Sequence, residues 1–324
     1  MTTNVSYLTA IQEEIRAVED RIRTQAEGYH PDIGAALELL LSSGGKRLRP
    51  TVTLLIGHMV DAPADRLVTL ASAIELLHTA TLVHDDLIDG SLLRRGNPTL
   101  NSQWSPGATV LTGDFLFSRA AKLAAETESL PVIQLFTQTL TVIVNGEITQ
   151  LFSSRSRISR QDYFHRIYAK TASLLETSAK SAALIAPEPD DDTVEEMRQF
   201  GYEIGMAFQI VDDILDFTSD EKVLGKPVGS DVRQGIVTLP TLIYGEISPD
   251  DPDLRNLLDE NCPIIEEQVF RLVKAIRESP AIDLAFEQAT QFVQRGLVSL
   301  RKQPASPERQ SLEELAEYIV QRKK

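Results

Sequence analysis

Apolar residues recur along most of the chain at steps of three and four residues, which is the spacing of an amphipathic helix. Leu67, Leu70, Ala71, Ile74 and Leu77 illustrate this pattern. The strict alternation that is typical of strands is scarce, and short stretches rich in glycine and proline separate the periodic segments. The pattern therefore predicts an all-α protein.

The continuity of this pattern bears on the domain organisation. No internal repeat, low-complexity tract or long linker interrupts the periodic segments. A chain of 324 residues could form two domains, although one large helical domain is also physically possible. We predict a single all-helical domain over residues 1–324, with residues 223–235 forming a mobile flap over a site.

Charge and cysteine content exclude several classes of protein. A net charge of -15 disfavours binding to nucleic acid, because such binding draws on a basic surface. Cys262 is the single cysteine, so an intrachain disulfide and every CxxC motif are excluded. The N-terminus lacks a basic region followed by an apolar core, and no apolar run approaches the roughly 18 residues of a membrane span. We therefore expect a cytoplasmic protein without a membrane span.

Two motifs of the form DDxxD lie within apolar helical segments, at residues 85–89 and 212–216. At about 100° per residue, the three carboxylates of one motif fall within a single arc of the helix surface, so all three are predicted to point the same way. Like charges one turn apart cost a helix about 0.2–0.5 kcal/mol per pair in water, and more when solvent is removed. Each motif therefore predicts a bound cation.

Ligands that are all oxygen indicate a hard ion, and Mg²⁺ is usually held by one or two carboxylates together with water and substrate phosphate. Zinc is disfavoured because His78 and His84 lie on different helix faces. A single DDxxD could be an ordinary charged helix face. Two identical motifs in apolar surroundings favour magnesium ions that hold a diphosphate.

Two basic clusters suit the same ligand class. The segment GGKRLRP places Lys46, Arg47 and Arg49 after two flexible glycines, without the spacing of a Walker loop. Arg94 and Arg95 follow the first aspartate motif, and arginine binds diphosphate oxygens in a bidentate manner. Arginines beyond a helix end could instead simply favour the helix dipole. Two separate clusters predict two separate diphosphates.

The combination of GGKRLRP, DDLID followed by LLRRG, and DDILD resembles the trans-type polyprenyl diphosphate synthase family. The resemblance implies an all-α, isoprenoid-synthase-type helical bundle around a central cavity, usually as a homodimer. It also implies a Mg²⁺-dependent prenyltransferase that condenses isopentenyl diphosphate with an allylic diphosphate in repeated head-to-tail (1'-4) steps. Three magnesium ions are expected with diphosphate bound. The expected product is a medium- or long-chain all-trans polyprenyl diphosphate.

The resemblance implies roles for individual residues. The direct magnesium ligands would be Asp85, Asp89 and Asp212, while Asp86 and Asp216 would reach the metal through water or the flanking ion. The residues that would bind isopentenyl diphosphate are Lys46, Arg49, His78 and Arg95. The residues that would bind the allylic diphosphate are Arg94, Lys170, Thr171, Gln209 and Lys226. The catalytic group, which would stabilise the departing diphosphate, is Asp85, Asp89, Asp212, Arg94 and Lys170.

Spacing supports some of these assignments, since His78 and Gln209 each share the helix face of a following aspartate motif. Taken alone, Lys170 could be an ordinary exposed lysine and Gln209 a hydrogen-bonded core amide. Gly205, one turn before Gln209, would leave room for a ligand or a closely packed helix. One departure from the family is Ile236 in GIVTLP, where a lysine is common, so one contact to the allylic diphosphate is in doubt.

Product length depends on what blocks the tunnel beneath the first motif. Ala80 and Thr81 are small, so the growing chain should pass that level. Residues that could form a floor deeper down are Leu77, Ile74, Ile143 and Val144. We predict a product longer than farnesyl diphosphate, and transient membrane contact for its release.

Two alternatives remain open. A terpene cyclase or a head-to-head condensing enzyme also ionises an allylic diphosphate, although cyclases usually carry a different second motif and do not need the GGKRLRP cluster. A noncatalytic helical subunit that modulates an active synthase would be expected to have lost one aspartate motif, and both are intact here. Extension that depends on isopentenyl diphosphate distinguishes these possibilities.

Overall fold

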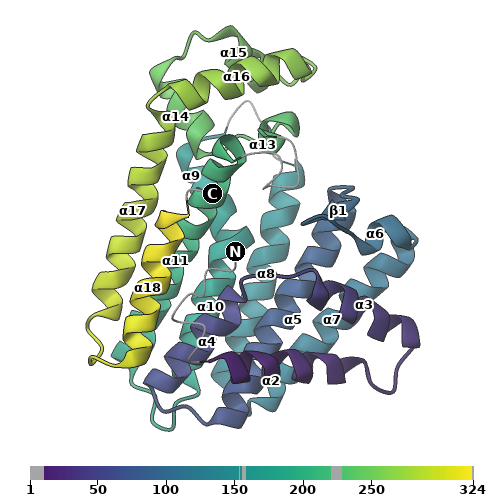
Figure 1. Ribbon diagram of the computed structural model, residues 1–324, viewed down its shortest axis with the longest axis vertical. Coiled ribbons are helices and arrows are strands. Elements are labelled where there is room, and N and C mark those ends of the chain that lie inside the picture. Colours follow the sequence, from purple (N-terminus) through teal and green to yellow (C-terminus); the bar gives the residue numbers. More distant parts are fainter. Residues whose placement is uncertain (1–10, 153, 155–157, 220–227, 323–324) are drawn as a thin grey trace. The chain divides into compact units, whose positions relative to one another are not determined.

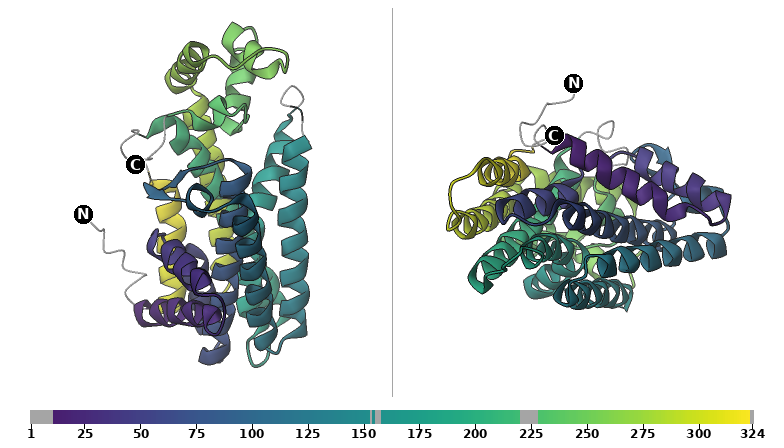
Figure 2. Two further views of the ribbon diagram at one scale, coloured as in Figure 1. Left: turned by 90° about the vertical axis from the view of Figure 1, so that its right-hand side faces the viewer. Right: turned by 90° about the horizontal axis from the view of Figure 1, so that it is seen from below.

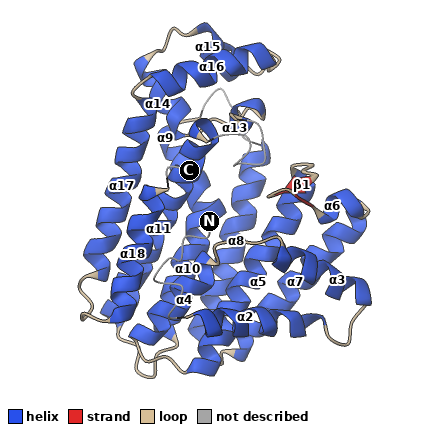
Figure 3. Ribbon diagram, in the orientation of Figure 1, coloured by secondary structure: helices blue, strands red, loops and turns tan. Residues whose placement is uncertain are grey.

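The computed structural model describes residues 11–152, 154, 158–219 and 228–322. Helices dominate these residues, in which the only strands are β1 (Leu93–Arg94) and β2 (Asn97–Pro98) (Figure 3). The prediction of an all-α protein is confirmed. Tertiary contacts divide the chain into two compact units. Unit 1 comprises residues 1–140, 174–201 and 299–314, and unit 2 comprises residues 141–173, 202–298 and 315–324.

Unit 1 contains the N-terminal helices and the β1–β2 hairpin. Its complete elements are α2 (Gln12–Arg23), η1 (Thr24–Ala26), α3 (Pro31–Ser42), α4 (Leu48–Met59), α5 (Ala64–Ile88), β1, β2, α6 (Leu100–Gln103) and α7 (Pro106–Glu126). It also includes parts of α8 (Leu130–Phe152), α10 (Ser173–Leu184), α11 (Asp191–Thr218), α17 (Ala281–Leu300) and α18 (Pro307–Gln321).

α5 is the core helix of unit 1. It packs on α7, α4 and α2, and the apolar residues that predicted this helix, among them Leu67, Ile74 and Leu77, are fully buried (Figures 1 and 2). Within the described residues, α5 is the one helix long and apolar enough to cross a membrane, and 72% of that apolar window is buried inside the structure. Such burial is typical of a helix whose apolar surface is used for packing.

A glycine permits the close approach of α5 and α7. A Cβ atom at Gly113 would lie 2.1 Å from Nε2 of His84, so no larger residue fits there without movement. Nε2 of His84 lies 3.1 Å from the carbonyl oxygen of Val110, and the imidazole packs edge-on against Phe117. His84 therefore joins the two helices, which gives it a structural role.

Unit 2 contains the remaining helices. Its complete elements are α9 (Arg160–Ile167), the π-helix η3 (Tyr168–Ala172), α13 (Ser230–Arg233), α14 (Leu239–Ile247), α15 (Pro252–Leu258) and α16 (Glu266–Glu278). α15 and α16 pack against each other, and α14 contacts both α9 and α16 (Figure 1). The chain passes from one unit to the other within α8, α10, α11, α17 and α18. The expectation of a single domain stays a prediction.

Candidate functional site

The first aspartate motif lies at the C-terminal end of α5. Gly90, with a φ of 63°, ends the helix in a Schellman motif, and Asp89 becomes the C-terminal cap. The last turn of α5 contains no basic residue. Its carboxylates lie at the C-terminal end of the helix, which is the negative end of the helix dipole. Because the last turn has no basic residue, only cations from elsewhere can neutralise them.

The three carboxylates of this motif do not point the same way, which corrects the prediction from helical geometry. Asp85 is half-buried and Asp89 is exposed, but Asp86 is only 5% exposed. Nε and Nη2 of Arg94 donate to the Asp86 carboxylate at 2.8–3.0 Å. The offset of about 100° between adjacent residues turns Asp86 towards the hairpin, away from Asp85. Arg94, expected to bind a diphosphate, already has a carboxylate partner.

The β1–β2 hairpin brings Arg95 to the glycine-rich segment. Leu93 pairs with Pro98 and Arg94 with Asn97, so the two-residue turn consists of Arg95 and Gly96, both with positive φ. That is the geometry of a type I′ turn. The guanidinium of Arg95 donates to the carbonyl oxygen of Gly44. Arg95 and the glycine-rich segment, both predicted to lie at the site for isopentenyl diphosphate, are therefore neighbours although they are far apart in the sequence.

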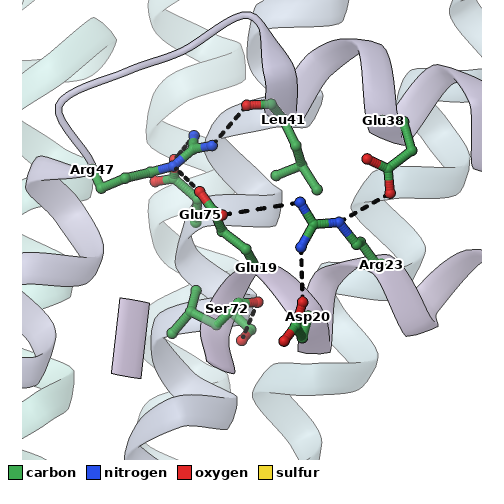
Figure 4. Close-up of polar contacts among 9 residues, drawn as sticks. Glu19, Asp20, Arg23, Glu38, Leu41, Arg47, Ser72 and Glu75 are labelled. Carbon is green, nitrogen blue, oxygen red and sulfur yellow. Dashed lines mark hydrogen bonds and ion pairs between the residues drawn. The ribbon is translucent and has the colours of Figure 1, made fainter. Parts of the chain in front are cut away.

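Arg47 differs from the other basic residues of its segment. It caps α4 in a left-handed conformation, with φ of 47°, and its guanidinium is fixed on three sides (Figure 4). Nε donates to Glu19 (2.9 Å), Nη1 to Glu75 (3.0 Å) and Nη2 to the Leu41 carbonyl (2.9 Å). Arg47 is thus committed to holding α2, α3, α4 and α5 together. Lys46 is exposed and Arg49 is half-buried at the N-terminus of α4, where an anion is favoured.

His78 lies among these positive charges. Burial lowers its pKa well below 6.5, and the nearby guanidinium groups of Arg49, Arg94 and Arg95 lower the pKa further. The imidazole is therefore neutral at physiological pH and can offer one N–H donor to an anion without adding charge.

The residues expected to control product length belong to the interior of α5. Ile74, Leu77 and Ala80 are fully buried, while Thr81 is half-buried and donates its hydroxyl to the carbonyl of His78 at 2.8 Å. In unit 2, Ile143 is buried, whereas Val144 is 44% exposed. Their role in setting product length stays a prediction.

The second aspartate motif lies in the last two turns of α11, which again contain no basic residue. Asp212 is its accessible member, with a side chain 40% exposed. Its carboxylate accepts a hydrogen bond from Nη2 of Arg322 at 2.5 Å, and this guanidinium also stacks 4.3 Å from the Phe208 ring centroid. Arg322, near the end of the chain, was not anticipated from the sequence. It supplies the positive charge that Asp212 requires.

The other two aspartates of this motif are buried. Asp213 accepts hydrogen bonds from the Tyr163 hydroxyl (2.7 Å) and from Nε2 of Gln209 (2.8 Å). Asp216 accepts from the backbone amide of Asp231 at 3.0 Å. Here too the carboxylates point in different directions, so the expectation of a shared direction is wrong for both motifs. Burial and the negative charge of Asp231 raise the pKa of Asp213 to about 7.

Lys170 and Thr171 lie on the π-helix η3, a type of turn that often marks functional sites. Two glycines make room for it: a Cβ at Gly146 would lie 2.4 Å from Cβ of Ala169, and one at Gly205 would lie 2.6 Å from Cα of Ala172. The close packing expected at Gly205 is confirmed.

Both candidate side chains of η3 have partners within unit 2. Nζ of Lys170 lies 3.1 Å from Oε1 of Glu147, and Thr171 donates its hydroxyl to Oε1 of Gln209 at 2.6 Å. Two of the residues expected to bind the allylic diphosphate, Thr171 and Gln209, therefore belong to one hydrogen-bonded group, whereas the neighbouring Lys170 pairs with Glu147. Glu147 and Tyr163 were not anticipated, because only the tertiary fold brings them to these positions.

Two earlier expectations concern the segment after α11. Lys226 and residues 223–227 of the expected flap lie outside the described residues. Ile236 is half-buried, and its amide donates to the carbonyl of Asp231 at 2.8 Å. At the adjacent residue, Nη2 of Arg166 donates to the carbonyl of Val237 at 2.6 Å.

The accessible carboxylates of each unit, taken separately, are oxygen donors of the kind that magnesium prefers. They are Asp85 and Asp89 in unit 1 and Asp212 in unit 2, where Arg322 already neutralises Asp212 as a cation would. Among the described residues, no group of three or more acidic, histidine or cysteine side chains is close enough to hold a metal alone. That agrees with Mg²⁺, which takes one or two protein carboxylates and completes its coordination with water and phosphate.

Comparisons with known proteins agree with these features. The family model described as polyprenyl synthetase matches residues 30–276. A prenyl transferase from Synechocystis sp. is 35% identical over 99% of both chains. Heptaprenyl diphosphate synthase component 2 from Geobacillus stearothermophilus is 35% identical over 96% of this chain and 97% of the relative.

Among solved structures, a polyprenyl synthase from Caulobacter crescentus, complexed with calcium and isoprenyl diphosphate, matches with a TM-score of 0.90 and 33% identity, covering 98% of this chain and 97% of that one. The family match spans well over half of this chain. This chain belongs to the polyprenyl synthetase family.

Proposed function

We propose that this protein is a Mg²⁺-dependent prenyltransferase that adds isopentenyl diphosphate repeatedly, head to tail, to an allylic diphosphate. One observation carries the proposal: two long helices each end in acidic residues without a basic residue in the last turn, and each end has separate basic side chains in its own unit. Acidic ends of this kind suit cations that are shared with a diphosphate. The chemistry matches the names of the relatives.

The two diphosphates would be bound by different groups. Lys46, Arg49 and Arg95, with neutral His78, would bind the diphosphate of isopentenyl diphosphate. Lys170, Thr171, Gln209 and Lys226, with Arg94, would bind the allylic diphosphate. The cations of the second group would stabilise the negative charge that develops on the departing allylic diphosphate, which is the largest catalytic contribution expected from the protein.

The metal site would use Asp85, Asp89 and Asp212 as direct ligands, with Asp86 and Asp216 supporting them. Bound magnesium ions, three in number, would neutralise the diphosphate as it leaves. Because Asp86 and Asp216 are buried and already accept hydrogen bonds, their contribution would be to hold the helix ends in place.

We also propose that the whole chain acts as one catalytic domain in the cytoplasm, as a homodimer. Exposed apolar side chains on α7 support a second copy, because Leu111 is 69% exposed and borders a surface cavity of about 500 Å³. Release of an apolar product would involve transient membrane contact. Light scattering of the purified protein tests the dimer.

The product is proposed to be longer than farnesyl diphosphate. Ala80 leaves space beneath the first motif, and Ile74 and Leu77 would form the floor. The heptaprenyl product in the name of the Geobacillus relative supports a medium or long chain.

The decisive experiment incubates the purified protein and Mg²⁺ with labelled isopentenyl diphosphate and, in separate reactions, geranyl, farnesyl or geranylgeranyl diphosphate. Extension of at least one starter to a product longer than farnesyl diphosphate is expected by chromatography. Absence of any extension dependent on isopentenyl diphosphate would refute the proposed function. Cyclised products would favour a terpene cyclase, and farnesyl diphosphate as the sole product would refute the proposed length.

A further inference from the structure

A buried hydrogen-bonded chain of four side chains ends at one of the candidate diphosphate ligands. It begins at Tyr163 on α9, whose side chain is completely buried, and its hydroxyl donates to Oδ2 of Asp213 on α11 at 2.7 Å. Oδ1 of Asp213 accepts from Nε2 of Gln209 at 2.8 Å, one turn earlier on the same helix. Oε1 of Gln209 in turn accepts from the hydroxyl of Thr171 on η3 at 2.6 Å.

The chain has a defined direction. In its ionised form the Asp213 carboxylate only accepts hydrogen bonds, so Gln209 must then turn its NH₂ group towards Asp213 and its carbonyl oxygen towards Thr171. The orientation of this amide turns the hydroxyl hydrogen of Thr171 towards Gln209 and leaves the second N–H of Gln209 as a donor to an anion. Tyr163 occupies the second oxygen of Asp213 and so prevents the carboxylate from rotating.

We propose that Tyr163 is a positioning residue for the allylic diphosphate, acting on Gln209 through Asp213. This inference rests on the proposed function, in which Thr171 and Gln209 bind that diphosphate. Asp213 then serves as the internal acceptor of the chain and does not ligate metal. Preorganisation of this kind lowers the entropy lost when the ligand binds.

Lys170 provides an internal contrast. It lies beside Thr171 on η3, but its ammonium group is held by Glu147 on α8 at 3.1 Å. None of the four members of the chain takes part in that ion pair. The two neighbouring ligands are therefore oriented by independent groups, which separates the effect of Tyr163 from general damage to η3.

The test compares Tyr163→Phe with Tyr244→Phe. Tyr244 is also buried and donates its hydroxyl to an aspartate, Asp251, at 2.7 Å, but this aspartate caps α15 and none of its hydrogen-bond partners belongs to the candidate site. Both variants lose one hydroxyl from a tyrosine–aspartate bond and should lose similar thermal stability. Only Tyr163→Phe is expected to raise the KM for the allylic diphosphate, by about tenfold, the change that corresponds to one net hydrogen bond.

The KM for isopentenyl diphosphate should stay within about twofold of the wild type, as expected for a group that touches only the allylic ligands. Calorimetric titration with the thiolo analogue of farnesyl diphosphate and Mg²⁺ should show the same loss of affinity without turnover. A double-mutant cycle of Tyr163→Phe with Thr171→Val should be non-additive, whereas the cycle with Glu147→Gln should be additive.

The outcomes separate the two proposals. A wild-type protein that extends no starter refutes the proposed function. The positioning role alone is refuted by a different result. In that case the wild type extends its starter, but Tyr163→Phe and Tyr244→Phe have the same KM for the allylic diphosphate and the same affinity for the analogue. If Tyr163→Phe does not fold, Asp213→Asn takes its place, because asparagine replaces one carboxylate oxygen with an NH₂ group and so cannot accept at both of the positions that face Tyr163 and Gln209. An unchanged allylic KM in that variant overturns the inference.

Discussion

The two aspartate motifs have the same pattern and occupy the same position at the end of a long helix, but their surroundings differ in charge. Asp86 of the first motif is held by the guanidinium of Arg94, beside a group of cations that lowers the pKa of His78. Asp213 of the second motif is held by two neutral donors, and Asp231 helps to raise its pKa to about 7. Identical motifs therefore do not imply identical electrostatics.

What the motifs share is the accessibility of the first aspartate. Asp85 and Asp212 keep partly exposed carboxylates, whereas the second aspartate of each motif is buried and used by the protein itself. The comparison supports the proposal that the first position binds ligand and that the second gives internal support.

The largest expected effect tests the shared feature. Asp85→Asn and Asp212→Asn should each lower turnover by at least about 10²-fold, because each removes a charge that stabilises the departing diphosphate through the metal. Initial rates of labelled product formation measure this. Asp65→Asn, an exposed aspartate in the first turn of α5, is the matched control and should be nearly neutral. Near-normal turnover of either variant would contradict the role of the first position.

A smaller effect tests the difference between the second positions. Arg94→Ala leaves Asp86 as a buried carboxylate without its charged partner, and should lower the free energy of unfolding by about 1–3 kcal/mol. Urea denaturation of the protein measures it. Arg94→Lys keeps the charge but not the fork of two donors, so it should lose less. Equal losses for the alanine and lysine variants would mean that the charge of Arg94 does not support Asp86.

The smallest expected effect is on the pH dependence of stability, and the two regions should respond in opposite directions. The lowered pKa of His78 means that the folded state binds fewer protons than the unfolded state. The contribution of His78 to the free energy of unfolding is therefore complete above about pH 6.5 and is lost as the pH falls below that value. The raised pKa of Asp213 means that the folded state binds more protons between about 3.8 and 7, so stability is lost as pH rises through that range.

Replacing each group with a neutral amide tests this opposition. The stability advantage of the wild type over His78→Gln should shrink as pH falls below about 6.5, while its advantage over Asp213→Asn should shrink as pH rises towards about 7. Thermal unfolding between these limits measures both differences. Parallel profiles for the two variants would show that the charges around the two motifs do not differ as described.

Much of the fold could be predicted from sequence, since helical periodicity is a local property and the structure follows it along α5 and α11. The aspartate motifs, Lys170 and Gln209 were also found from sequence, and Gly205 was correctly expected to permit close packing. Periodicity could not predict the direction of Asp86 and Asp213, because that depends on the hairpin that carries Arg94 and on α9 that carries Tyr163. The π-helix was missed because it departs from the α-helical period itself.

Arg322 and Glu147 were missed for a related reason. Neither belongs to a motif, and Arg322 lies 110 residues from the aspartate that it contacts. A basic side chain near the end of a chain usually lies in solvent, so nothing local distinguishes this one. Only the tertiary fold shows that it is 5% exposed and paired with Asp212.

The turn at Arg95 has a consequence for attempts to make the protein more heat-resistant. Arg95 has a φ of 53°, a conformation that glycine or asparagine adopts with less strain, and this strain lowers the stability of the folded state by roughly 1–2 kcal/mol. A stabilisation programme guided by backbone preference would replace this residue first. It would remove backbone strain from the hairpin and delete the guanidinium that the turn presents, so thermostability and the proposed binding of isopentenyl diphosphate compete at this one position.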